Sequence, residues 1–496
     1  MSMKLPRFGT DGWRALIAED FTFDNVRYIA AAMVAHAKDF ARLCATASSK
    51  EGAVDLKMTT SDVLNPTIAV GYDTRFLSPQ FARALSEQAA KCGAKVLLSR
   101  APCPTPALSF SVKHLGLPGG IMITASHNPP TYNGVKFKSY YGGSAMVEET
   151  RAIEAHLHRI AEMDEIPTSA GGSVTEVDFL PEYYANLEKF VDVDILRRFK
   201  GRVIFNPMFG AGCNTVDAFL RKLGVDVLTL NGKPDPMFGG KSGPEPVAMN
   251  MSEHIEAMKS DAGAVLGLAT DGDADRFGVL DEDGEFVQLH DLMPLLFRYL
   301  VRTRGYSGDV VRTTSMADTI DKVAGKLGRT VYEVPVGFKN VCEVMLKKDI
   351  LIGGEESGGF GYKNHVPERD GVLSCLLAAE MMASTGKSMK EAVAELRAEF
   401  GPFAYDRIGK HASDMNKLRA NFAGLRANPP SEVVGIKVAR VNLIDGVKFY
   451  LEDGSWMLMR LSDTEPLGRV YVGSGTREQV ATVLGAGEAL LFKDCQ

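Results

Sequence analysis

The 496-residue sequence is poor in cysteine and has little net charge. Its seven cysteines are odd in number and never spaced as C-x-x-C, so we expect reduced, mostly buried thiols of a cytoplasmic protein. The 62 acidic residues outnumber the 56 basic ones, for a net charge of −6. A protein that binds nucleic acid through its overall field needs the opposite sign.

Long apolar runs are also missing. The runs that occur, such as "IMITA" and "AVLGLA", suit buried strands and fall far short of the roughly 18 residues of a membrane span. Segment 1–14 has no apolar stretch of the kind that marks a secretory signal. We therefore expect a cytoplasmic protein with neither a membrane nor a nucleic acid as partner.

The composition and patterning predict a multidomain α/β protein. Hydrophobic residues make up 45% and charged residues 24% of the chain, as in folded soluble proteins. Up to about residue 400, helical and strand-like segments alternate, which predicts βαβ units with parallel or mixed sheets. Beyond it, alternating strands broken by Asp-Gly turns predict an α+β domain. We expect three α/β domains with mixed sheets and a C-terminal α+β domain, at 1–178, 179–284, 285–400 and 401–496.

The first chemically distinctive loop is "TASHNPPTYNGVKF" (124–137), which follows the strand-like "GGIMI". It places the Ser126 hydroxyl at a strand end, where an α/β sheet presents reactive groups to a cleft. A simple Asx/Pro turn explains the same residues. A serine hydrolase is a weaker alternative, because the sequence is not G-x-S-x-G, although His127 is adjacent.

A second loop, "ATDGDADRFGVL" (269–280), carries the alternating carboxylates Asp271, Asp273 and Asp275. Such close like charges repel unless a hard cation neutralises them, and an all-oxygen set suits Mg²⁺. The spacing also resembles a calcium EF-hand loop. However, the sixth place is Arg276 instead of glycine, and the flanks are strand-like where an EF-hand needs helices. A solvated acidic turn is the other alternative, while Arg276 adds a ligand for phosphate.

A third loop, "GGEESGGFGY" (353–362), sets Glu355, Glu356 and Ser357 among glycines. Glycines let a ligand approach the backbone, and these side chains suit sugar hydroxyls. Upstream, "PVGFKN" places Lys339 in a similar strand-end loop. A glycine-rich turn with solvated glutamates is the alternative.

A fourth loop, "RLSDTEPLGRVYV" (460–472), follows the strand-like "WMLM". Arg460 offers a guanidinium fork, Ser462 and Thr464 offer hydroxyls, and adjacent backbone N–H groups can form an anion nest. These groups suit a phosphate, although a polar loop between two strands explains them equally well.

The four loops together provide what phosphosugar isomerisation by phosphoryl relay requires. The chain also resembles the α-D-phosphohexomutase superfamily, of the phosphoglucomutase/phosphomannomutase type, over nearly its whole length. The motifs that carry the resemblance are "FGTDGWR", "TASHNP", "DGDADR", "GEESGG" and "RLSDTEP", in this order. The resemblance implies three related α/β domains and a final α+β domain around a central active-site cleft.

The resemblance also implies roles for individual residues. Ser126 would be the phosphoserine and would hold Mg²⁺ together with the three aspartates. Arg14 and Lys136 would offset charge near the phosphoserine, and His127 and Lys339 are the candidates for the general base. The further substrate contacts would be Arg276, Gly337, Lys339, Glu355 and Ser357, with Arg460, Ser462 and Thr464 holding the phosphate that is not reacting.

One residue departs from the family pattern, because Asp463 stands where the last motif usually has glycine. A carboxylate beside a phosphate site is unfavourable unless it points away. Aspartate enters positive φ at lower cost than most residues, so the backbone turn can persist.

The implied activity is reversible conversion of a hexose 1-phosphate to the 6-phosphate, with glucose 1-phosphate as first choice and mannose 1-phosphate as second. It would use one Mg²⁺ per active site and glucose 1,6-bisphosphate as activator and intermediate. The alternatives are a phosphoglucosamine-type mutase, a metal-dependent sugar-phosphate phosphatase and a non-catalytic sugar-phosphate binder. We expect a monomer or a homodimer.

Overall fold

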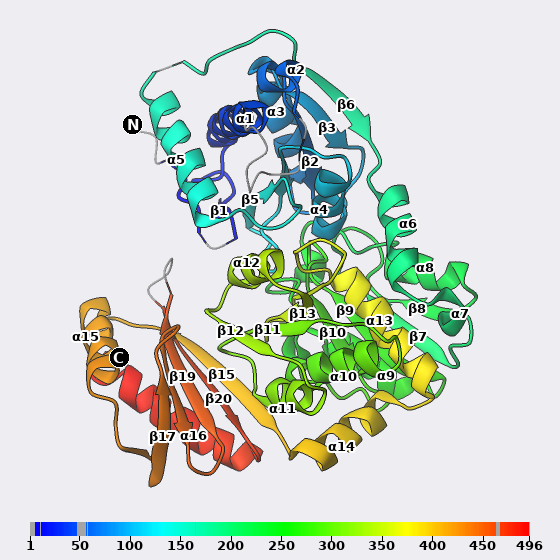
Figure 1. Ribbon diagram of the computed structural model, residues 1–496, viewed down its shortest axis with the longest axis vertical. Coiled ribbons are helices and arrows are strands. Elements are labelled where there is room, and N and C mark those ends of the chain that lie inside the picture. Colours follow the sequence, from blue (N-terminus) through cyan, green and yellow to red (C-terminus); the bar gives the residue numbers. More distant parts are fainter. Residues whose placement is uncertain are drawn as a thin grey trace.

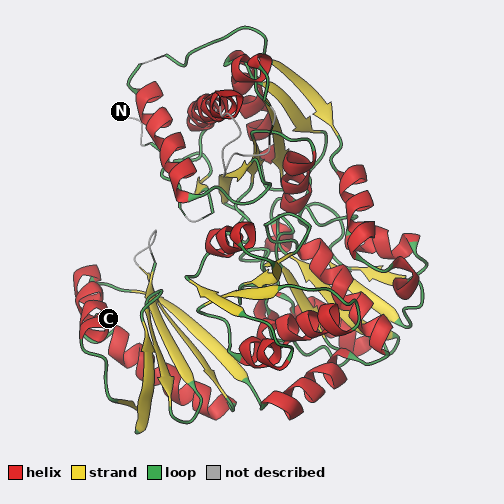
Figure 2. Cartoon of the chain, viewed as in Figure 1, coloured by secondary structure: helices red, strands yellow, loops and turns green. Residues whose placement is uncertain are grey.

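The structure is a computed structural model that describes residues 5–9, 11–46, 56, 58–163, 165–462 and 467–495. Within these ranges the strands form four sheets in chain order, and each sheet with its helices forms one unit (Figure 1). Three units mix helices with strands, and the fourth is an antiparallel sheet with two helices (Figure 2). This confirms the predicted fold class. No helix in the described ranges is long and apolar enough to cross a membrane.

The first unit has a sheet of strand order β1-β5-β4-β2-β3-β6. Its strands are β1 (Trp13–Leu16), β2 (Thr67–Tyr72), β3 (Lys95–Ser99), β4 (Gly119–Ile123), β5 (Tyr132–Ser139) and β6 (Ser173–Val177). Its helices are α1 (Phe23–Thr46), α2 (Thr60–Leu64), α3 (Ser78–Lys91), α4 (Thr105–His114) and α5 (Val147–Ala161). Ile68 and Val70 pack toward α1, α3 and α5, whereas Ala69 between them packs toward α4, as the alternation along a strand requires.

The second unit has the strand order β10-β9-β7-β8 and the third has β12-β11-β13-β14. The second contains α6 (Leu180–Phe190), α7 (Val193–Leu196), β7 (Arg202–Asn206), α8 (Val216–Lys222), β8 (Asp226–Thr229), η1 (Phe238–Gly240), η2 (Ala248–Asn250), α9 (Ser252–Ser260), β9 (Ala264–Thr270) and β10 (Phe277–Leu280). The third contains α10 (Leu289–Arg302), β11 (Asp309–Thr313), α11 (Thr319–Lys326), β12 (Val331–Val334), α12 (Phe338–Lys347), β13 (Ile350–Gly354), β14 (Phe360–Tyr362), α13 (Gly371–Thr385) and α14 (Met389–Phe400).

The same hairpin recurs in the three α/β units. In each, a strand of the parallel group is followed by an antiparallel neighbour: β4 by β5, β9 by β10, and β13 by β14. The turn of each hairpin carries one of the loops singled out in the sequence. Carboxyl ends of parallel strands are where α/β sheets bind ligands, so the topology gives each unit one equivalent loop.

Helix α13 joins the second and third units. Residues 371–382 are all buried, and the helix contacts β9 and β10 of the second unit as well as α10 of the third. Asp370 caps its first turn by accepting from the Leu373 N–H, and Gly386 ends it in the left-handed conformation. A helix that is apolar on every side must be covered on every side. One hydrophobic core therefore runs through both units.

The fourth unit is an antiparallel sheet of order β15-β20-β19-β18-β17-β16. Its elements are β15 (Ala404–His411), α15 (Met415–Ala427), β16 (Glu432–Val433), β17 (Ile436–Asn442), β18 (Val447–Leu451), β19 (Trp456–Leu461), β20 (Leu467–Ser474) and α16 (Arg477–Leu491). Met457 and Met459 pack toward α16, and Trp456 and Leu458 lie on the opposite face. This alternation is typical of a sheet covered by helices on one face.

Leu376→Ala should lower the free energy of unfolding by about 2–5 kcal/mol, because Leu376 is fully buried in α13 and its truncation leaves a cavity. Urea denaturation measures the change. Leu346→Ala is the matched control, since Leu346 is 46% exposed, and it should change stability by no more than about 0.5 kcal/mol. Equal losses for the two variants would contradict the shared core.

Candidate functional site

The turn between β4 and β5 holds Ser126 at the carboxyl end of the first sheet. The residue is 1% exposed, and its backbone is left-handed with φ 52°, which is strained for a residue other than glycine. The N–H of Ser126 donates to Thr124 Oγ1 at 2.9 Å. The predicted Asx/Pro-containing turn therefore presents this serine in one defined conformation.

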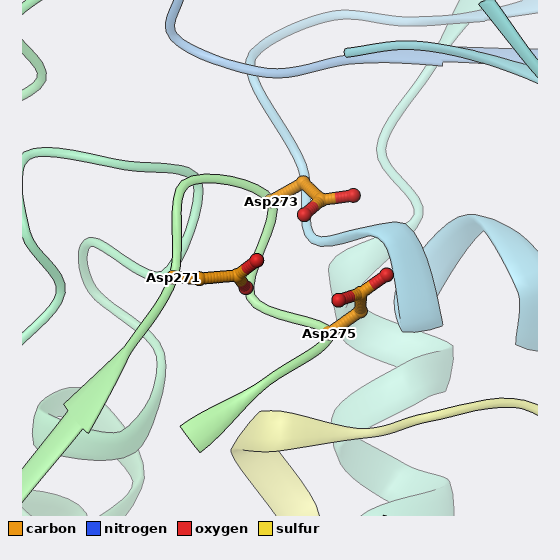
Figure 3. Close-up of side chains that lie close together, drawn as sticks. All are labelled: Asp271, Asp273 and Asp275. Atoms are coloured by element: carbon orange, nitrogen blue, oxygen red, sulfur yellow. The ribbon is translucent and has the colours of Figure 1, made fainter. Parts of the chain in front are cut away.

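The side chains of three aspartates in the turn between β9 and β10 lie close together (Figure 3). Asp271, Asp273 and Asp275 are fully buried, and each offers an oxygen within 4.8 Å of the others. Within the described residues, Asp273 Oδ1 and Asp275 Oδ1 have no hydrogen-bond partner. Burial and the two neighbouring carboxylates raise the pKa of Asp271 well above its ordinary value. Unsatisfied, mutually repelling oxygens of this kind fit a hard divalent cation.

The serine loop and the acidic loop are in direct contact. Ser126 Oγ donates a 2.8 Å hydrogen bond to Asp271 Oδ2, across 145 residues of sequence. The backbones also touch, because a Cβ at Gly272 would lie 2.6 Å from the Ser126 carbonyl oxygen. Glycine is therefore required at this close approach. The hydroxyl and the carboxylate triplet thus form one site.

Lys136, on β5, supplies positive charge opposite the carboxylates. Its Nζ lies 2.8 Å from Asp273 Oδ2, 2.9 Å from Asp275 Oδ2 and 3.1 Å from Asp11 Oδ2. Burial opposes the charge of Lys136, but the three carboxylates outweigh burial and raise the pKa of the ammonium. Lys136 in turn holds the pKa of Asp273 below its ordinary value despite burial.

His127 and Arg14 flank the serine. His127 Nδ1 lies 3.5 Å from Ser126 Oγ. Burial and the nearby guanidinium groups of Arg276 and Arg14 hold the pKa of His127 well below its usual range, so the neutral imidazole is favoured. Arg14 Nη1 donates to Asn128 Oδ1 of the same turn at 2.8 Å, which places a cation at the edge of the site.

Asp11 and Arg369, to which the sequence alone assigned no role, complete the charge balance. Arg369 Nη2 donates to Asp11 Oδ2 and to Asp275 Oδ2, both at 2.7 Å, and Nη1 lies 3.7 Å from Glu355 Oε2. Burial opposes the charge of Arg369, but Asp275 and Asp11 outweigh it and raise the pKa of the guanidinium. Asp11 lies inside the motif "FGTDGWR", and Arg369 is the lone cation of "PERDG", just before the apolar α13. The motif around Asp11 and the position of Arg369 before an apolar helix were the sequence signals that could have identified these two residues.

The turn between β13 and β14 carries Glu355, which is 4% exposed. Its Oε1 accepts from the N–H of Gly337 at 2.9 Å. Burial raises the pKa of Glu355 to about 7, against the opposing effect of Arg369. The neighbouring Glu356 accepts a hydrogen bond from Ser315. Two predicted substrate contacts, Glu355 and Gly337, therefore lie together.

Arg460 lies on β19 in the fourth unit. Its Nε is 2.7 Å from Asp445 Oδ2, and the same oxygen accepts from the N–H of Val336 at 2.8 Å. The fourth unit is thereby linked to the loop that precedes α12. Thr464, predicted to bind phosphate, and Asp463, the departure from the family pattern, lie outside the described residues.

The structure does not bring all of the predicted site residues into contact with one another. Arg276 lies at the triplet, with Nε 3.9 Å from Asp275 Oδ1. The N–H of Ser462 donates to the Leu467 carbonyl at 2.8 Å, beside Arg460 on the fourth sheet. In the part of the chain that the structure describes, no hydrogen bond or ion pair joins the Ser126 and aspartate cluster to the residues Lys339, Ser357 and Arg460.

Family models match three consecutive parts of the chain. They are described as phosphoglucomutase/phosphomannomutase α/β/α domain I at residues 46–164, domain II at 181–284 and domain III at 289–400. These ranges contain the serine loop, the acidic loop and the Glu355 loop, respectively.

Known proteins resemble the chain over most of its length. The phosphoglucomutase/phosphomannomutase of Thermococcus kodakarensis is 32% identical, over 86% of this chain and 90% of its own. A "probable phosphoglucosamine mutase" of Methanothermobacter thermautotrophicus is also 32% identical, over 83% and 87%. The crystal structure of a "putative phosphomannomutase" from Thermus thermophilus has a TM-score of 0.82 and 36% identity, and covers 99% of this chain and 100% of that one.

Sequence motifs, sheet topology and these similarities agree along the chain. The chain therefore belongs to the phosphoglucomutase/phosphomannomutase family of the α-D-phosphohexomutase superfamily, and it is a phosphomutase, an isomerase-class phosphotransferase.

Proposed function

We propose that the chain reversibly converts a hexose 1-phosphate to the hexose 6-phosphate, with phosphorylated Ser126 as the phosphoryl carrier. The observation that carries this proposal is the 2.8 Å contact of Ser126 Oγ with Asp271 Oδ2 inside the buried carboxylate triplet. Asp271, Asp273 and Asp275 would hold Mg²⁺ together with an oxygen of phosphorylated Ser126. When bound, Mg²⁺ supplies positive charge to the oxygens of the group in transfer.

Two phosphoryl transfers complete the isomerisation. In the first, the free hydroxyl oxygen of the sugar bonds to the phosphorus on Ser126, the bond from phosphorus to Ser126 Oγ breaks, and the hydroxyl proton passes to a base. The bound hexose 1,6-bisphosphate then turns end over end. Its other phosphoryl group returns to Ser126 in the reverse sequence, and Ser126 is phosphorylated again. For the preferred substrate the intermediate is glucose 1,6-bisphosphate, which would also act as activator.

Of the two candidates for the base, His127 lies beside Ser126. Its Nδ1 lies 3.5 Å from Ser126 Oγ, whereas Lys339 is partly buried on α12 in the third unit. Arg14 pairs with Gly134, two residues before Lys136 on β5, so the two cations lie on the same face of the first sheet. They would stabilise the charge that spreads over the transferring group. In this proposal the permanent cations stabilise charge, and either His127 or Lys339 takes the proton.

Residues of the third and fourth units, with Arg276 of the second, would hold the rest of the substrate. Glu355 and Ser357 would bind sugar hydroxyls, with Arg276, Gly337 and Lys339 as further substrate contacts. The phosphate that is not reacting would be held by Arg460, Ser462 and Thr464. The link from Arg460 through Asp445 to Val336 supports this division, because it joins the fourth unit to the loop that precedes α12, next to Gly337.

We further propose that the four units are domains at 1–178, 179–284, 285–400 and 401–496. Each of the four sheets of the described chain lies within one of these ranges. The shared core around α13 favours the second and third domains moving together, because separating them would expose buried apolar surface.

Glucose 1-phosphate is the first choice of substrate and mannose 1-phosphate the second, because "GEESGG" resembles glucose- and mannose-type members. A phosphoglucosamine-type mutase is the second candidate, since a relative of that name is as similar as the phosphoglucomutase/phosphomannomutase. Coupled assays with the three sugar 1-phosphates and Mg²⁺ should rank glucose 1-phosphate first by kcat/KM, with turnover stimulated by glucose 1,6-bisphosphate. Release of inorganic phosphate without isomerisation would instead indicate a phosphatase.

Ser126→Ala should lower mutase turnover by several orders of magnitude, because the group that carries the phosphoryl is lost. Intact-mass analysis should find one phosphate on the wild type and none on the variant. Ser86→Ala is the matched control, since Ser86 is a buried serine of the same unit whose Oγ donates to the Ala82 carbonyl. Near-wild-type turnover by Ser126→Ala would end the phosphoserine hypothesis.

Asp273→Asn should weaken Mg²⁺ binding and lower activity, with partial rescue at high Mg²⁺, because a charged ligand is replaced by a neutral oxygen. Titration calorimetry gives the Mg²⁺ dissociation constant. Asp281→Asn is the control, since Asp281 follows β10 and accepts from the N–H of Glu285 outside the triplet. Unchanged Mg²⁺ affinity and activity in Asp273→Asn would make the triplet a structural turn.

A further inference from the structure

Arg75 lies buried beneath the Ser126 turn. It follows β2, which pairs with β4 in parallel, so the carboxyl ends of the two strands meet at the same sheet edge. The Arg75 side chain is 0% exposed. Arginine is almost never fully buried unless its charge and donors are paired. The hydrogen-bond partners of Arg75 therefore indicate its structural role.

Those partners are carbonyl oxygens of the serine turn and of Tyr132, the first residue of β5. Nη2 donates to the carbonyls of Ser126 and Asn128, both at 2.6 Å, and Nη1 donates to those of Pro129 and Tyr132 at 2.8 and 3.0 Å. A guanidinium presents its donors in a rigid planar fork. One rigid group thus fixes three carbonyls of the turn and the first carbonyl of β5.

Asp73 holds Arg75 and reaches Ser126 from the other side. Its Oδ2 lies 3.2 Å from Arg75 Nε and accepts from Thr124 Oγ1 at 2.6 Å. Thr124 Oγ1 in turn accepts the N–H of Ser126 at 2.9 Å. Both backbone polar groups of Ser126, its N–H and its carbonyl, are therefore tied to the Asp73–Arg75 pair.

The conformation of Ser126 explains why such a support is needed. Its φ of 52° lies in the left-handed region, which is strained for a residue other than glycine and persists only where surrounding bonds fix it. Phe238 of the second unit covers the Arg75 guanidinium, with its ring centre 5.0 Å from Cζ. Asp73 balances the charge of Arg75. Arg75 therefore supports the turn through the geometry of its hydrogen bonds and not through a net charge.

We propose that Arg75 is a positioning residue for phosphoryl transfer: it fixes the direction of Ser126 Oγ and thereby sets turnover, with little effect on substrate affinity. The proposal rests on the proposed role of Ser126 as phosphoryl carrier. Arg75 binds the backbone of the turn, and Ser126 Oγ stays available to Asp271. Displacing a reacting group by about 1 Å can lower a rate by about 100-fold.

Arg75→Lys separates geometry from charge, because lysine keeps the charge and loses the planar fork. We expect kcat to fall by about 100-fold with KM close to that of the wild type. Arg304→Lys is the matched control: Arg304 pairs with the buried Glu380 and donates to Tyr306 Oη at 2.8 Å, in the third unit. Arg304→Lys should lower the melting temperature about as much as Arg75→Lys does, and it should leave kcat unchanged.

Wild-type kcat in Arg75→Lys would overturn the proposal, and so would equal kcat losses in Arg75→Lys and Arg304→Lys. If Arg75→Lys does not fold, Thr124→Val tests the same support, because it removes the hydroxyl that accepts the N–H of Ser126. It should lower kcat with KM unchanged, and an unchanged kcat would overturn the proposal. Ser126→Ala keeps the two hypotheses apart, because an inactive Ser126→Ala beside a fully active Arg75→Lys rejects the positioning role alone.

Discussion

Three carboxylates buried within 4.8 Å of one another impose an electrostatic constraint on the whole protein. Their mutual repulsion has to be offset by positive charge, and that charge comes from other units: Lys136 from the first and Arg369 from the segment before α13. Lys136 and Arg369 both pair with Asp275, so removing either cation would leave the buried negative charge only partly balanced, which is costly in a protein interior. The contacts that balance the site therefore also hold the units together around it.

The site has one loop from each α/β unit because the same hairpin recurs in each sheet. The turns after β4, β9 and β13 carry the serine, the aspartates and Glu355, respectively. Each turn leaves the carboxyl end of a parallel strand, where backbone polar groups face outward and ligands bind. One topological position, used three times, thus presents a serine, three aspartates and a glutamate, to which we assign the roles of phosphoryl carrier, cation site and sugar-hydroxyl acceptor in our proposal.

Much of the fold and of the site core could be predicted from the sequence because its signals are local. The alternation of helices and strands indicated the fold class, and Asp271, Asp273 and Asp275 are close in space because they alternate in one short turn. Arg369 could not be found in the same way, since its partners Asp275 and Asp11 lie 94 and 358 residues away. Arg75 could not be found from the sequence either, because its partners are backbone carbonyl groups, which every residue has.

The claim that Ser126 hands its phosphoryl group to the sugar is tested most directly by a single-turnover experiment. Phosphorylated protein, freed of bisphosphate, would be mixed with Mg²⁺ and less than one equivalent of the preferred hexose 1-phosphate. Protein mass and sugar products would then be followed in time. We predict that the protein loses one phosphate at the rate at which hexose 1,6-bisphosphate appears. Hexose 6-phosphate that forms while the phosphate stays on the protein, or phosphate released to water instead of to the sugar, would contradict the mechanism.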